Sequence, residues 1–259
     1  MRRLAIACAA ITMWIACSGS TGSKLLSFQA AAGGPLDATK GQPYSFANAQ
    51  GYAVKLTSAS MQIGAIYLNR SVPLASERET SCVLPGTYVA EVRQPLVVDV
   101  LSPELQPFPG AGEGTADRAV TAEIWVGSGD INQPNDPTIV LSAKGTAAKN
   151  GVDYPFEASF TIGANRQEPP SSSALPGSNP ICQQRIISPF PVDVTPTDGG
   201  TLTIRIDPKG WFRSVDFSTL SASSSGTFRF VDALEGQASI NLYYGYRATE
   251  GAYLFEWQQ

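Results

Sequence analysis

The sequence predicts an all-β fold, mainly an antiparallel β-sandwich of about 8–10 strands with one or two short helices near the C-terminus. Three observations support this prediction. Short runs rich in β-branched and aromatic residues alternate apolar and polar positions along most of the chain. Clusters of Gly, Pro, Asn and Asp separate these runs. The segments between the runs read as turns rather than as the crossover helices that a parallel sheet requires.

The strands follow from the alternation, taken in chain order. Residues 24–43 are mostly small, polar or Gly/Pro-bearing and are expected to form a loop or an irregular first strand. Alternation runs from Tyr52 to Leu56 and resumes at Met61 with opposite parity, which predicts a β-bulge or a bend between sheets. The Asn150-Gly151 pair predicts a type I′ hairpin. Further strands are expected at Thr87–Val92, Leu96–Leu101, Ala119–Val126, Thr138–Gly145, Val152–Ile162, Pro191–Thr195 and Thr201–Ile206.

Two helices are expected near the C-terminus. Asp207-Pro208 combines an N-cap residue with a first-turn proline. Asp232 and Glu235 have the spacing of a capping box that would begin a second helix. Aromatic side chains in this last region could form a sugar-stacking platform, but their helical and alternating spacing favours the core. They are Tyr243, Tyr244, Tyr246, Tyr253, Phe255 and Trp257.

Composition excludes most catalytic chemistries. The 259 residues contain no histidine, which removes His-based nucleophile systems and imidazole metal ligands. A net charge of −4 makes non-specific nucleic-acid binding unfavourable. No nucleophile-elbow, Ser-Lys or P-loop motif occurs, and Gly110 to Gly114 lacks the spacing of a dinucleotide site. We therefore assign no catalytic residue and no cofactor, and a non-enzymatic role is favoured.

The N-terminus has the pattern of an export signal. Arg2 and Arg3 precede an apolar run, Leu4–Ile15, that is too short to span a bilayer. Ala16-Cys17 follows, and then a Ser/Gly-rich stretch. The junction resembles the lipobox of bacterial lipoproteins. An ordinary signal peptide cut near Ala16 and an uncleaved anchor helix are the alternatives.

The resemblance to bacterial lipoproteins implies an organisation for the whole chain. Residues 1–16 would be a signal peptide, and Cys17 would carry acyl chains, including palmitate. Residues 17–43 would be a tether and residues 44–259 a single β-sandwich domain. Ser18 stands where the family's inner-membrane retention signal has Asp, so the outer membrane of the cell envelope is the expected location. The bilayer would then be the partner, with a protein or glycan partner left open.

Cysteine use agrees with export. Cys8 lies within the signal, and Cys17 is the acylation site implied by the resemblance, so Cys82 and Cys182 remain. In an oxidising compartment they are expected to form one disulfide, with two unpaired buried thiols as the alternative. Two remaining thiols and no histidine do not make a zinc site.

Two groups of polar residues could carry chemistry. Asp130, Asn132 and Asp136 could bind Ca²⁺ as part of a carbohydrate-binding module, but an Asx-turn hairpin between strands 119–126 and 138–145 uses the same residue types and is favoured. A pair of carboxylates could serve a glycoside hydrolase, but carboxylates on strands are expected to face solvent. The candidates are Asp99, Glu123 and Glu157. The leading hypothesis is a membrane-anchored protein with a non-catalytic binding or structural β domain.

Overall fold

The computed structural model describes residues 24–72, 87–127, 136–162, 185–233 and 235–259. The predicted N-terminal signal, Cys17, Cys82, Cys182, Asp130 and Asn132 lie outside these residues. Strands make up 53% of the structure and helices 9%, so the predicted all-β, sandwich-like fold is confirmed. Among the described residues, no helix is both long and apolar enough to cross a membrane.

The strands belong to one mixed sheet of fourteen, in which β13, β10, β9, β3, β4, β7, β1, β12 and β14 are neighbours in that order. Most pairs are antiparallel, but β1–β12 and β10–β13 are parallel. The strands are β1 (Leu25–Gly33), β2 (Tyr44–Ala47), β3 (Ala53–Asn69), β4 (Tyr88–Val92), β5 (Leu96–Asp99), β6 (Gln106–Pro107), β7 (Gly112–Thr115), β8 (Ala119–Val126), β9 (Asp136–Lys149), β10 (Val152–Ile162), β11 (Ile186–Val194), β12 (Thr201–Ile206), β13 (Phe228–Arg229) and β14 (Tyr253–Gln258).

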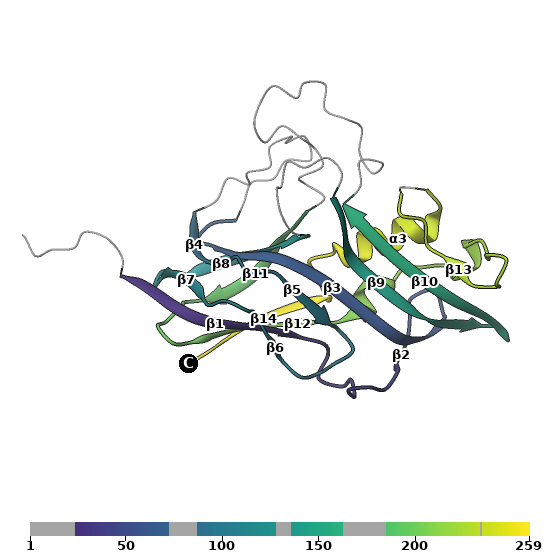
Figure 1. Ribbon diagram of the computed structural model, residues 1–259, viewed down its shortest axis with the longest axis horizontal. Helices are drawn as coiled ribbons and strands as arrows, with labels where there is room; N and C mark the ends of the chain where they lie inside the picture. Colours follow the sequence, from purple (N-terminus) through teal and green to yellow (C-terminus); the bar gives the residue numbers. More distant parts are fainter. Residues whose placement is uncertain (1–23, 73–86, 128–135, 163–184, 234) are drawn as a thin grey trace, which may run out of the picture.

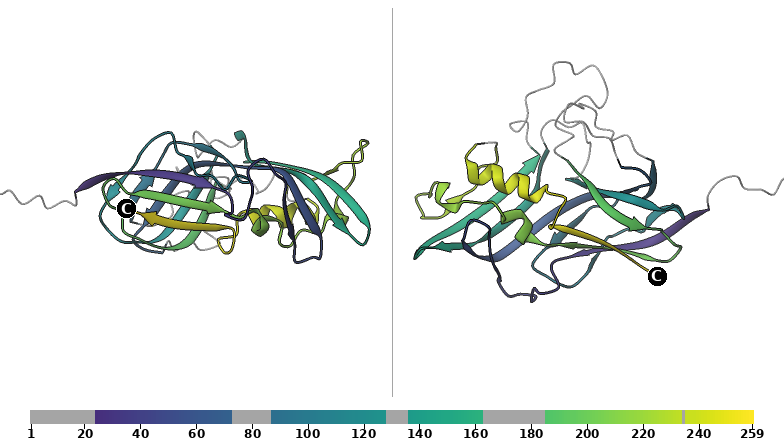
Figure 2. Two further views of the ribbon diagram at one scale, coloured as in Figure 1. Left: turned by 90° about the horizontal axis from the view of Figure 1, so that it is seen from below. Right: turned by 180° about the vertical axis from the view of Figure 1, so that it is seen from behind.

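The helices are short and lie on one side of the long strands. They are α2 (Pro208–Phe212), the 3-10 turn η2 (Phe217–Thr219) and α3 (Gln237–Tyr246). In the views of Figures 1 and 2 the helices lie against the β9–β10 ribbon. Phe156 of β10 contacts Phe212 and Phe217, with ring centroids 5.5 and 4.9 Å apart. One face of β9 and β10 is therefore covered, and the opposite face is left to solvent.

The core lies between this sheet and the strands that fold back over it. The Tyr253 phenol on β14 donates to the Tyr246 carbonyl oxygen at 2.6 Å and lies 3.5 Å from Met61 Sδ on β3, although β14 and β3 are far apart in the sheet order. Phe190 of β11 packs against Tyr253 and Phe255, with centroids 5.1 and 5.2 Å apart. This confirms that Tyr253, Phe255 and Trp257 share a face packed on the core.

Strand β1 corrects the prediction for residues 24–43. Leu25–Gly33 is a regular strand that pairs with β7, β6 and β12, so these residues belong to the domain and not to a tether. Its second half is the run Ala30-Ala31-Ala32, which is buried on both faces. Alanine has low β propensity, and a run of three alanines shows no alternation of apolar and polar residues. The strand forms nevertheless because neighbouring segments bury both of its faces.

Strand β3 organises the sheet because five strands of the described chain, β2, β4, β5, β8 and β9, pair along its length. Residues 53–61 pair with β9, and residues 63–69 pair with β8. The expected hairpin between strands 119–126 and 138–145 is therefore wrong, since β8 and β9 each pair with β3. A register shift between Leu56 and Ser58 confirms the predicted bulge. A second shift near Gly64 turns Tyr67 away from the core face.

The predicted Asn150-Gly151 turn and one of the two predicted helix caps are confirmed, and the other cap is not. Asn150 and Gly151 have φ angles of 52° and 77°, as a type I′ turn requires. Asp207 caps α2, and its Oδ1 accepts from the Lys209 N–H at 2.9 Å. The second predicted cap is wrong, because α3 begins at Gln237 after Gly236. Asp232 instead accepts hydrogen bonds from the backbone N–H and the hydroxyl of Thr161 on β10.

Candidate functional site

Two hollows adjoin on the solvent face of the sheet. The first, of about 390 Å³, lies over β3 and β5, and the second, of about 350 Å³, lies over β9 and β10. Ser142 lines both. The first is lined by Gly41, Gln42, Thr57, Ser58, Ala59, Ser60, Val97, Asp99, Leu101, Gln106 and Ser142, and the second by Ser142, Lys144, Glu157, Ala158, Ser159, Arg229 and Phe230. We call the two hollows together the polar groove.

The strand register arranges the polar side chains of the groove in rows across the sheet. One row crosses β5, β3, β9 and β10 and consists of Asp99, Ser60, Ser142 and Ser159. A second crosses β3, β9, β10 and β13 and consists of Ser58, Lys144, Glu157 and Arg229. Neighbouring strands are about 4.8 Å apart, so the first row extends for roughly 14 Å.

The hydroxyls of the first row are available to a ligand. Within the described chain, the hydroxyls of Ser60, Ser142 and Ser159 make no hydrogen bond. In the second row Lys144 Nζ pairs with Glu157 Oε1 at 3.2 Å. The groove has two basic and two acidic side chains, Lys144 and Arg229 with Asp99 and Glu157, so its charges balance.

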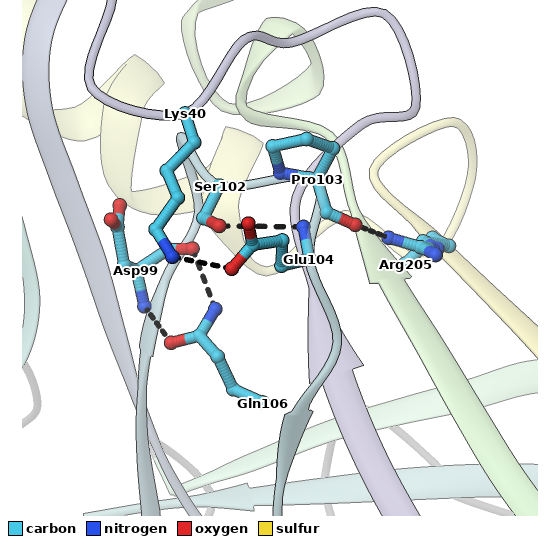
Figure 3. Close-up of polar contacts among 7 residues, drawn as sticks. All are labelled: Lys40, Asp99, Ser102, Pro103, Glu104, Gln106 and Arg205. Atoms are coloured by element: carbon cyan, nitrogen blue, oxygen red, sulfur yellow. Dashed lines mark hydrogen bonds and ion pairs between the residues drawn. The ribbon is translucent and has the colours of Figure 1, made fainter.

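The loop between β5 and β6 forms one wall of the groove (Figure 3). The Asp99 N–H donates to Gln106 Oε1, and Gln106 Nε2 donates to the Asp99 carbonyl oxygen, each at 2.9 Å. Lys40 forms an ion pair with Glu104 across the loop. On the far side Arg205 Nη1 donates to the Pro103 carbonyl oxygen. Three separate interactions therefore stabilise this wall: the Asp99–Gln106 hydrogen bonds, the Lys40–Glu104 ion pair and the hydrogen bond from Arg205.

Close backbone packing also holds this loop. The Gly34 N–H donates to the Ser102 carbonyl oxygen at 2.7 Å. A Cβ on Gly34 would lie 2.2 Å from the Val100 carbonyl oxygen, so no other residue fits without moving the loop.

A larger, more apolar hollow of about 650 Å³ lies between the loop after β1, the end of β12 and the start of β14. Two of its charged groups bind each other: Lys209 Nζ contacts Asp37 Oδ2 at 2.9 Å, and the nearby Tyr44 phenol donates to Asp37 Oδ1 at 2.9 Å. The hydrogen bond from Lys209 is the main cause that lowers the pKa of Asp37, and burial raises the pKa of Tyr44 to about 12. Because these groups already stabilise the fold, the polar groove is the better candidate.

The three candidate carboxylates do not form a catalytic pair. Asp99 and Glu157 lie at opposite ends of the groove, three strands apart. That separation of about 14 Å exceeds the roughly 5–10 Å between the carboxylates of glycosidases. Glu123 is not exposed as expected: it is fully buried on β8, where Tyr67 and Trp125 are its neighbours.

Of the candidate calcium ligands, only Asp136 lies among the described residues, whereas the C-terminal tyrosines are all described. Asp136 is the first residue of β9, opposite Ile162. Among the described residues, no three His, Cys, Asp or Glu side chains come close enough to hold a metal ion. Tyr243 and Tyr246 are buried as expected, whereas Tyr244 is 59% exposed. The groove itself could not be found from the sequence, because its rows join residues from segments that are distant along the chain.

Comparisons with known proteins give one structural similarity. No protein-family model matches the chain, and no curated protein matches it. Among solved structures, the chain is similar to MbnP from Methylosinus trichosporium, with a TM-score of 0.39 and 12% sequence identity. The alignment covers 92% of this chain and 99% of that one.

Proposed function

We propose that this protein is a lipid-anchored protein of the bacterial outer membrane whose β domain binds an extended, neutral glycan without catalysis. The observation that carries the binding proposal is the polar groove, in which Ser142 joins two hollows. A ligand that contacts both hollows must be elongated. The anchoring proposal rests on the resemblance of Ala16-Cys17 and its surroundings to a lipobox.

The chemistry of the groove favours a hydroxylated ligand. Serine hydroxyls, a glutamine amide and a carboxylate each exchange hydrogen bonds with the hydroxyl groups of a sugar. The balanced charges favour neither a polyanion nor a polycation. A neutral glycan is both rich in hydroxyl groups and free of net charge, so it fits the groove. The separation of Asp99 and Glu157 argues against the hydrolase alternative.

A binding screen tests the ligand class. Full-length protein in a detergent without a sugar headgroup is immobilised and exposed to neutral linear oligosaccharides of increasing length and to acidic oligosaccharides of the same lengths. We expect affinity for the neutral series to rise with length until both hollows are filled. Equal affinity for single sugars and long chains, or preference for the acidic series, would contradict the proposal.

A further inference from the structure

Two buried polar side chains outside the groove have unused hydrogen-bonding capacity. Glu123 on β8 and Asn69 on β3 are both 0% exposed. Trp125 Nε1 donates to Glu123 Oε1 at 3.0 Å, and the Tyr88 phenol also interacts with this carboxyl, but no hydrogen bond within 3.5 Å reaches Glu123 Oε2. Neither the oxygen nor the nitrogen of the Asn69 amide has a partner either. Buried groups of this kind are rare in folded proteins and call for a bound water, an ion or a ligand.

The sheet register brings these two side chains close together. Glu123 lies opposite Tyr67, and Asn69 lies opposite Thr121, so all four point to one face of the β3–β8 pair. Glu123 and Asn69 are therefore diagonal neighbours, whose Cβ atoms are within about 7–8 Å of each other. One small ligand between them can contact both.

The surroundings favour a cation. The Tyr67 ring lies 4.9 Å from the Tyr88 ring and 5.4 Å from the Trp125 ring. The faces of such rings attract positive charge. Glu91 lies opposite Tyr67 on the β4 side, so a second carboxylate lies close by. Its charge is shared with Arg93, whose Nε lies 3.2 Å from Glu91 Oε1.

The number of oxygen atoms distinguishes between kinds of cation. Calcium requires six to eight oxygen ligands, as a rule. Glu123 Oε2 and the Asn69 amide oxygen are free, whereas Thr121 Oγ1 is used in a 2.9 Å hydrogen bond to the Ser71 carbonyl oxygen. Two acceptors beside aromatic rings suit a group that carries its own N–H donors.

We propose that an ammonium group, either the free ion or the end of a primary amine, binds between Glu123 Oε2 and the Asn69 amide oxygen beside the Tyr67, Tyr88 and Trp125 rings. Its N–H groups donate to both oxygens, and the rings provide a cation–π contact. Tyr88, which interacts with the Glu123 carboxyl, is itself 40% exposed. The site is independent of the polar groove.

Thermal unfolding of the full-length protein tests this proposal. The Tm is measured at equal ionic strength in ammonium, methylammonium, tetramethylammonium and sodium chlorides. We expect ammonium or methylammonium to raise the Tm above the sodium value in a saturable manner, because a ligand that binds the native state stabilises it. Tetramethylammonium, which has no N–H, is expected to match sodium. Equal Tm values in all four salts would indicate that only water fills the site and would overturn the proposal.

Matched variants locate the effect. Glu123→Gln keeps the size of the side chain and is expected to abolish the ammonium-dependent shift. Asn69→Leu removes the amide and is expected to do the same, which keeps the test valid if one variant fails to fold. Glu256→Gln changes an exposed carboxylate on β14, away from the site, and is expected to retain the full shift. An ammonium-dependent shift that survives in Glu123→Gln or Asn69→Leu would contradict the assignment.

Discussion

Asp99 and Gln106 bind each other reciprocally: the Asp99 N–H donates to the Gln106 amide oxygen, and the Gln106 amide nitrogen donates to the Asp99 carbonyl, each at 2.9 Å (Figure 3). The side chain of Gln106 thus takes the place of a strand partner where β5 ends. The carboxylate of Asp99 is left to line the groove, with Oδ1 accepting from the Leu101 N–H at 3.0 Å.

Replacing Gln106 by Ala should loosen this wall. Both hydrogen bonds to Asp99 are lost, and the half-buried position limits the effect to about 1–2 kcal/mol of unfolding free energy. Urea denaturation measures the change. Gln50→Ala, at an exposed turn, is the control and should change stability by less than about 0.5 kcal/mol. Equal effects of the two substitutions would show that the reciprocal pair does not hold the loop.

The proposed acylation of Cys17 predicts how the protein partitions between cell fractions. Cys17→Ser should move the protein from the membrane fraction to the soluble periplasmic fraction, because the lipid is the proposed anchor. Cys8→Ser, within the signal, should leave the protein in the membrane. A soluble wild type, or a processed Cys17→Ser protein that stays in the membrane, would refute the lipoprotein proposal.

Burial of Glu123 predicts a stability that depends on pH. Burial is the main cause that raises the pKa of this carboxyl above its ordinary value. The native state therefore binds a proton that the unfolded state releases, and the stabilisation is largest below the unfolded pKa and is lost as pH rises through the folded pKa. In buffer without ammonium, Glu123→Gln should gain stability relative to wild type between pH 4 and pH 7, as measured by urea denaturation. A constant difference across this range would contradict the assignment.

The Tyr52–Asp216 pair predicts a pH dependence of stability opposite in sign to that of Glu123. The Tyr52 phenol donates to Asp216 Oδ1 at 2.5 Å, and this hydrogen bond is the main cause that lowers the pKa of Asp216. A carboxyl with a lowered folded pKa stabilises the protein above its unfolded pKa and loses that contribution as pH falls through the folded pKa. Tyr52→Phe should cost about 1 kcal/mol near neutral pH and less in acid. If urea denaturation gives the same loss at pH 7 and pH 3, the hydrogen bond does not set the pKa.

The sequence predicts the strands where alternation is strong. The expected ranges of β8, β10 and β12 agree with the observed bounds, because each has one face in the core and β-branched or aromatic residues along it. Strand β1 was expected only as a loop or an irregular strand, because its Ala30-Ala31-Ala32 run shows no alternation and is buried by neighbours from other parts of the chain. The sequence around β1 carries no information about which distant strands will bury it.

The candidate site depends on partners that local patterns do not specify. Alternation places Glu123 on the face opposite Ile124 but does not show that neighbouring strands bury it. Asp232 has the spacing of a helix cap, yet its carboxylate binds Thr161 of β10 instead. The groove requires β3, β5, β9 and β10 to lie side by side in one register, which only the tertiary structure provides.

The most direct test of the central claim is the affinity of a groove variant for a neutral oligosaccharide long enough to fill both hollows. Ser142→Leu places an apolar side chain where the hollows meet, and Ser27→Leu makes the same change at an exposed position on β1, outside the groove. Isothermal titration calorimetry should show at least a tenfold loss of affinity for Ser142→Leu, roughly 1.4 kcal/mol, and none for Ser27→Leu. Unchanged affinity in Ser142→Leu, or an equal loss in both variants, would contradict the proposal that the groove is the binding site.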